Sequence, residues 1–102
     1  MARTAFEFVA GKLEQLTGFD SLQARGTVRL ALKEAGLDAR SATAAQIAVV
    51  VERVLPRELR SRGVAEGERV ARRILSELPR FRAEEPAAPE SPDDVFRRLA
   101  GR

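Results

Sequence analysis

The sequence contains no histidine, cysteine, tryptophan or tyrosine among its 102 residues. Without cysteine, disulfides and thiolate metal sites are both excluded, which fits a reducing compartment. Without histidine, the chain lacks the commonest general base and the commonest metal ligand. Neither a Ser-His-Asp nor a Cys-His catalytic device can therefore be built. We expect a protein that is not an enzyme and that holds no metal ion and no cofactor.

Long apolar runs are also missing. No segment approaches the roughly 20 apolar residues that span a membrane. The first sixteen residues are interrupted by Glu7, Lys12 and Glu14, unlike the apolar region of a signal peptide. The sequence therefore predicts a soluble cytoplasmic protein without membrane contacts.

Charge is plentiful but unevenly distributed. Charged residues make up 32% of the chain and apolar residues 44%, which suffices for one packed domain. Residues 53–82 contain nine arginines and four glutamates, a net charge of +5. Residues 83–94 contain five acidic residues and no basic one, a net charge of −5. We expect the acidic segment either to remain extended or to lie across the basic face.

Two amphipathic helices are predicted for the first third of the chain. The apolar face of the first is formed by Phe6, Val9, Leu13 and Leu16. Gly18 is expected to end this helix in the left-handed conformation. The second helix should run from Ser21 to Ala35, before Gly36, and it leaves Leu22 and Leu30 outside its apolar arc. That arc is formed by Ala24, Val28, Ala31, Leu32 and Ala35. Leu30 is therefore a candidate exposed contact for a partner.

Two features of this second helix are unusual. Gly26 lies in its interior, where glycine costs about 1 kcal/mol relative to alanine. The cost suggests either a close helix–helix crossing at Gly26 or a different helix boundary. Arg25, Arg29 and Lys33 form a basic stripe at i, i+4 and i+8.

A third helix should follow either the capping box that Thr43 and Gln46 form or a cap at Ser41. Its valine run, residues 49–51, would also suit a strand, but the chain offers no second strand-like segment to pair with it. We interpret it as the central, buried helix. Pro56 is expected to end it and to open a short turn that Gly63 closes.

A fourth main helix is predicted from Glu66 to Leu78, with Pro79 ending it. The fold class is therefore all-α: a compact bundle of four main helices over residues 4–80. Residues 81–92 read as a disordered, acidic, proline-rich linker. Residues 93–102 read as a short amphipathic helix.

The carboxyl-terminal helix predicts a docking peptide. Ser91 is a suitable N-cap, and Val95, Phe96 and Leu99 form a one-turn apolar face. Such anchors enter grooves on partner proteins, and one turn is too short to be stable alone. The alternatives are a frayed terminus, or Phe96 and Leu99 folding back onto this domain.

The arginines raise the alternative of a non-sequence-specific nucleic-acid-binding protein. Its candidate contacts are Arg57, Arg60, Arg62, Arg69, Arg72 and Arg73. Interleaved glutamates weaken this interpretation, because pairs such as Glu58–Arg62 and Glu68–Arg72 neutralise the face. Sequence-specific reading of DNA by the third helix is rejected, because its side chains offer almost nothing to contact bases.

The three residues Asp20-Ser21-Leu22 resemble the site at which acyl carrier proteins receive their phosphopantetheine arm. The resemblance covers these residues alone and implies a carrier-like protein modified on Ser21. The chain departs from that family in its short connection before Ser21 and in a basic, not acidic, second helix. Asp20 or Ser21 also suits a simple helix cap.

The first functional hypothesis is a non-enzymatic adaptor or assembly module. It would bind one or more proteins, including a second copy of itself, through Val95, Phe96, Leu99 and Leu30. Nucleic acid is the alternative partner, and a carrier-like role for Ser21 is the third hypothesis. The sequence does not identify the partner.

Overall fold

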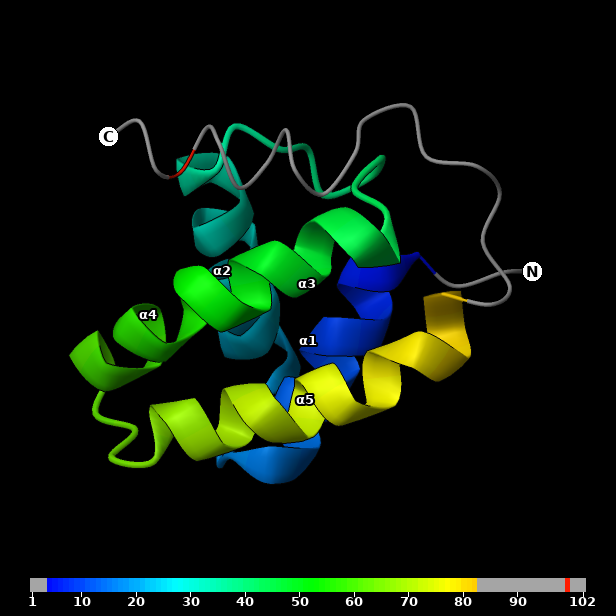
Figure 1. Ribbon diagram of the computed structural model, residues 1–102. Helices are drawn as coiled ribbons and strands as arrows, with labels where there is room; N and C mark the ends of the chain where they lie inside the picture. Colours follow the sequence, from blue (N-terminus) through cyan, green and yellow to red (C-terminus); the bar gives the residue numbers. More distant parts are fainter. Residues whose placement is uncertain (1–3, 83–98, 100–102) are drawn as a thin grey trace.

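Helices account for all the regular structure in the described residues (Figure 1). The computed structural model describes residues 4–82 and residue 99. The helices are α1 (Ala5–Leu16), α2 (Ser21–Glu34), α3 (Ala44–Arg53), α4 (Leu55–Ser61) and α5 (Gly67–Arg82). No strand occurs in this part of the chain, so the all-α class is confirmed. None of these helices is long and apolar enough to cross a membrane.

Capping boxes begin the first three helices. Thr43 accepts a hydrogen bond from the Gln46 amide at 3.2 Å, and its own amide donates to Gln46 Oε1 at 3.0 Å. Thr4 caps α1 and Asp20 caps α2 in the same reciprocal way. Each box satisfies amides that have no partner inside the helix. The predicted cap at Thr43 is therefore confirmed.

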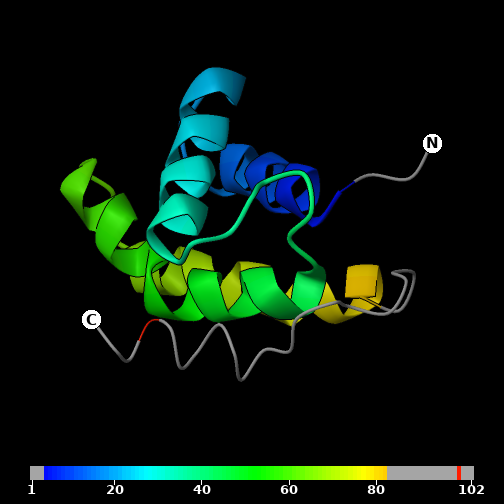
Figure 2. The same cartoon turned by 90° about the horizontal axis from the view of Figure 1, so that it is seen from above.

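The helices form two layers. Helices α1 and α2 pack against each other on one side, and α3 and α5 lie side by side on the other (Figure 2). Helix α3 contacts all four other helices, and α4 continues from it after a bend at Val54. The radius of gyration is 12.4 Å, close to the ~13 Å of a compact chain of this length.

The valine-rich segment is helical, as predicted. Ile47, Val50 and Val51 are at most 1% exposed, because they face the other helices. Ala48 and Val49 are only half-buried, however, and the end of α3 is exposed at Glu52 and Arg53. Helix α3 therefore contacts every neighbour without being enclosed on all sides.

The glycine signals at helix ends were right in two cases out of three. Gly36 and Gly63 adopt the left-handed conformation, with φ of 75° and 86°. Gly18 does not, so that prediction was wrong. Helix α1 ends instead through Thr17, whose hydroxyl donates to the Leu13 carbonyl at 2.7 Å and accepts from the Phe19 amide at 3.1 Å.

The prediction that Pro79 ends the last helix was also wrong. Helix α5 continues through Pro79 to Arg82, so residues 81 and 82 are helical. Proline removes one helical hydrogen bond and crowds the preceding turn. Contacts with the rest of the domain stabilise the last turn, because Leu78 is buried and the Phe81 ring lies 5.4 Å from the Phe8 ring of α1. Tertiary packing here outweighs the local preference.

Candidate protein-binding surfaces

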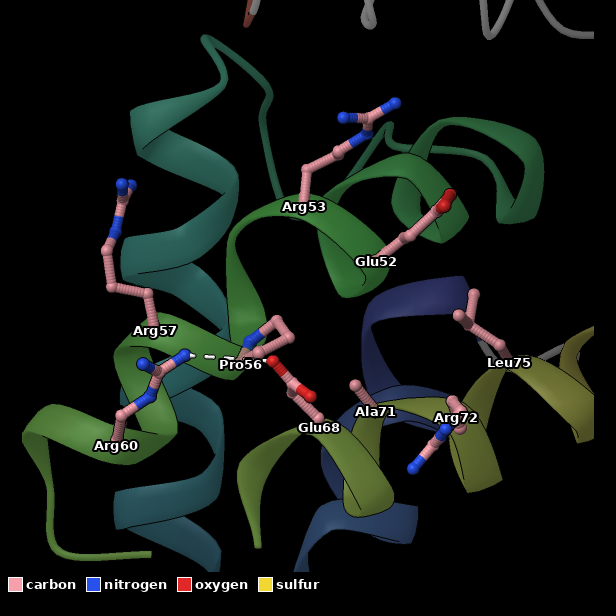
Figure 3. Close-up of a pocket in the computed structure, with 9 residues that line it drawn as sticks. All are labelled: Glu52, Arg53, Pro56, Arg57, Arg60, Glu68, Ala71, Arg72 and Leu75. Atoms are coloured by element: carbon pink, nitrogen blue, oxygen red, sulfur yellow. Dashed lines mark ion pairs between the residues drawn. The ribbon is translucent and has the colours of Figure 1, made fainter. Parts of the chain in front are cut away.

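A groove opens between α3, α4 and α5 (Figure 3). Its volume is about 360 Å³. Its apolar lining comes from Pro56, Ala71 and Leu75. Its charged lining residues are Glu52, Arg53, Arg57, Arg60, Glu68 and Arg72. Four arginines and two glutamates give the groove a net positive charge beside an apolar floor.

Local sequence signals shape this groove. The chain bends at Val54, and Pro56 occupies the first turn of α4, where its missing N–H costs nothing. At the near end of α5, Gly67 lies directly against α4. An added Cβ on Gly67 would stand 2.9 Å from the Pro56 carbonyl oxygen and 3.1 Å from Leu59 Cβ. The close approach of α4 and α5 therefore depends on this glycine.

Most of the arginines proposed for nucleic-acid binding have a glutamate beside them. The ion pairs are Arg57–Glu34 at 3.1 Å, Arg60–Glu68 at 4.0 Å, Arg62–Glu58 at 3.9 Å, Arg69–Glu66 at 3.0 Å and Arg73–Glu77 at 3.2 Å. Glu58–Arg62 was predicted correctly. Glu68 pairs with Arg60 of α4 and not with Arg72, since Figure 3 shows Arg60 directed at Glu68 across the groove.

The six proposed arginines do not all line the groove. Arg57, Arg60 and Arg72 line the groove, and Arg69 lines a neighbouring hollow of about 470 Å³ that Arg60 and Arg72 share. Arg62 and Arg73 line neither of these hollows. Arg53 of α3, which belongs to the same arginine-rich stretch, also lines the groove, because the chain bends at Val54 into α4.

Glu77 joins the two layers of the fold. Its carboxylate accepts a 2.7 Å ion pair from Lys12 of α1 and a 3.2 Å pair from Arg73 of its own helix. The Lys12 hydrogen bond, aided by Arg73, lowers the pKa of Glu77 below its usual value, although partial burial opposes the shift. The ion pair Lys12–Glu77 links positions 65 residues apart, which spacing rules within a helix do not predict.

A second surface lies on the outer face of α2. Leu22 and Leu30 are 81% and 48% exposed, which confirms that both fall outside the apolar arc of this helix. Gly26 lies between them, and a Cβ there would meet nothing within 4 Å. The predicted close helix crossing at Gly26 is therefore wrong within this chain; the close glycine contact is at Gly67 instead.

The remaining predicted site residues divide between inside and outside the described chain. Val95 and Phe96 lie outside the described residues. Leu99 is half-buried and packs against the hydrophobic core. Ser21 is exposed in the first turn of α2, and the N-cap is Asp20, which accepts from the Gln23 amide at 2.8 Å.

The described residues do not indicate a metal site. In residues 4–82 and 99, no three acidic side chains gather to hold a metal ion. Comparison with known proteins adds no analogy either. No protein-family model, no curated protein and no solved structure matches this chain, so its function has to be argued from its own surfaces.

Proposed function

We propose that this protein is a non-enzymatic protein-interaction module. Its groove between α3, α4 and α5 binds an acidic segment of a protein partner. The observation that carries the proposal is the combination of an apolar floor with four arginines and only two glutamates around it. Arginine suits this task because its planar guanidinium binds carboxylates through two parallel hydrogen bonds.

The floor favours a peptide over other ligands. Pro56, Ala71 and Leu75 offer apolar contact in a space of about 360 Å³. A partner segment with an apolar residue between acidic ones would fill the floor and pair with the rim. Apolar anchors of this kind supply affinity, whereas rim charges mainly supply specificity and association rate.

The same surface suits nucleic acid less well than it suits an acidic protein segment. Five of the six arginines proposed for it have a glutamate within 4.0 Å. Each such glutamate repels phosphate and competes with it for the guanidinium. None of the described residues that line the groove is aromatic, so they offer bases no ring on which to stack.

The test uses two matched variants of the full chain as affinity baits. Arg72→Glu reverses a charge in the groove, and Arg80→Glu reverses an exposed arginine of the same helix outside it. We expect Arg72→Glu to lose at least one protein that the wild type captures and Arg80→Glu to retain it. Retention of every captured protein by Arg72→Glu, or a lost protein whose binding segment lacks acidic residues, would contradict the proposal.

A titration with duplex DNA separates the alternative. Phosphate binding weakens steeply with salt, so any affinity should be greatest at low ionic strength. We expect no measurable binding at low salt. Tight binding that Arg72→Glu weakens would instead favour the nucleic-acid interpretation for the groove.

The carboxyl-terminal segment belongs to the same proposal as a docking peptide carried by this chain. Its anchors would be Val95, Phe96 and Leu99. Deletion of residues 83–102 should abolish binding of that partner and leave the helical content unchanged. Because Leu99 packs against the core, the melting temperature distinguishes the alternative. Unchanged binding with a lowered melting temperature would assign the segment to the domain's own packing.

A further inference from the structure

The outer face of α2 carries two parallel rows of side chains. At about 100° per residue, Leu22, Gly26 and Leu30 form one row along the helix, spaced four residues apart. Arg25, Arg29 and Lys33 form the adjacent row with the same spacing. Rows of this kind are the ridges that interdigitate when two helices pack. All these residues except the partly buried Gly26 are exposed.

Packing among the described residues does not require glycine at position 26. Its φ is not in the left-handed region, and apart from the backbone of its own helix an added Cβ would meet no described atom within 4 Å. Alanine there would favour the helix by about 1 kcal/mol. Gly26 does, however, leave a notch between two exposed leucines. A foreign helix would approach the backbone closely at that notch, as small residues allow.

Among the described residues, the second row has no acidic counterpart. Neither Arg25, Arg29 nor Lys33 forms an ion pair within residues 4–82, although Arg29 lies over the Phe6 ring at 5.4 Å. Helix α2 has a single acidic residue, Glu34, and its carboxylate pairs with Arg57 of α4. The exposed face of α2 therefore combines two leucines with three positive charges that no described acidic residue pairs with.

We propose that this face of α2 binds an acidic amphipathic helix of a protein partner. A small or apolar residue of that helix seats over Gly26 between Leu22 and Leu30. Its glutamates or aspartates pair with the basic row. A second copy of this chain fits poorly, because α2 against α2 would oppose like charges on both sides of the contact.

This surface is separate from the groove. The groove is lined by α3, α4 and α5 and by no residue of α2. Figure 2 shows the first turns of α2 projecting from the layer that contains α3 and α5. The inference therefore does not depend on the groove, and Arg72→Glu should leave binding to α2 unchanged.

Because the chain has no cysteine, a single introduced thiol reports on this face alone. Lys33→Cys on the full chain, labelled with benzophenone maleimide, is irradiated in a cell extract. Arg40→Cys, in the exposed loop after α2, is the matched control. We expect Lys33→Cys to capture a protein other than the partner of the groove. The captured protein should be crosslinked through an acidic, helix-forming segment. The control should not capture it.

The captured segment, synthesised with a fluorescent label, then probes the chain without added cysteine. Gly26→Ala should bind it about tenfold more weakly, because a methyl group fills the notch. The same variant should melt at a higher temperature than the wild type, which excludes unfolding as the cause. Leu22→Ser and Arg25→Glu should also weaken binding, and Arg40→Glu should not.

Several results would overturn the inference. Capture only of a second copy of this chain would assign the face to self-association. Equal capture from Lys33→Cys and Arg40→Cys would show no site at all. Unchanged affinity of Gly26→Ala would remove the notch from the argument.

Discussion

Helices α2 and α5 contain the same kinds of residue but use them differently. Both carry basic side chains, a glycine and an apolar stripe. On α5, Arg69 and Arg73 pair with nearby glutamates, and Gly67 is pressed against α4. On α2, the basic row forms no ion pair with any residue that the structure describes, and Gly26 faces open space.

The two helices differ in where the partners of their glycine and their charged side chains lie. A buried glycine and paired charges serve the fold, because their partners lie within the chain. A glycine that contacts no other helix, and like charges without a described partner, lower the free energy of unfolding. No contact among the described residues offsets that loss. Features that the fold itself does not need indicate a requirement outside it. The comparison predicts that substitutions on α5 destabilise, whereas substitutions on the outer face of α2 are neutral or stabilising.

The largest contrast is expected between the apolar residues of the two helices. Ile74→Ala on α5 removes a side chain that is fully buried, and it should cost about 2–5 kcal/mol of unfolding free energy. Leu30→Ala on α2 should change it by less than about 0.5 kcal/mol, because Leu30 is 48% exposed. Urea unfolding measures both. A loss above 1 kcal/mol for Leu30→Ala would show that α2 is covered within this chain.

The glycines provide the second contrast, with opposite signs. Gly67→Ala places a methyl group 2.9 Å from the Pro56 carbonyl, and the overpacking should cost about 1–3 kcal/mol. Gly26→Ala should stabilise the fold by about 1 kcal/mol. Thermal and urea unfolding of the two variants decide the matter. The comparison fails if both substitutions shift stability in the same direction.

The third prediction concerns the acid dependence of α5. Lys12 lowers the pKa of Glu77 in the folded state, so folding favours the ionised carboxylate. Its stabilising effect is present above the usual glutamate pKa and is lost as pH falls through the lowered value. Glu77→Gln should therefore flatten the decline of stability in acid. Glu66→Gln, in an exposed pair, is the control and should retain most of that decline.

Much of the fold followed from the sequence, because apolar spacing and caps are local signals. The inner arc of α2 was predicted residue by residue, and so was the capping box of Thr43. The errors arose where distant contacts decide. No local sequence pattern near Pro79 predicts that Phe81 packs on Phe8.

The candidate surfaces were less accessible from sequence than the helices. The sequence identified Leu30 and the basic row, since helical periodicity alone places them outward. It did not identify the groove, because Arg53, Arg57 and Arg72 meet only after α3 bends into α4 and α5 folds back. The close glycine contact was assigned to Gly26 and not to Gly67, since a sequence cannot show what lies opposite.

The smallest effects test the charges themselves. Arg69→Gln removes an exposed ion pair with Glu66 and should destabilise by about 0.2–1 kcal/mol. Arg25→Gln removes a like-charge neighbour of Arg29 and should stabilise by about 0.2–0.5 kcal/mol. Both changes should shrink as salt is added, because exposed charges are screened. The two changes in unfolding free energy should have opposite signs at low salt and converge at high salt. That result would show that the arginines of α5 stabilise the fold, whereas those of α2 slightly destabilise it. Destabilisation by Arg25→Gln would mean that Arg25 already has a partner within the chain.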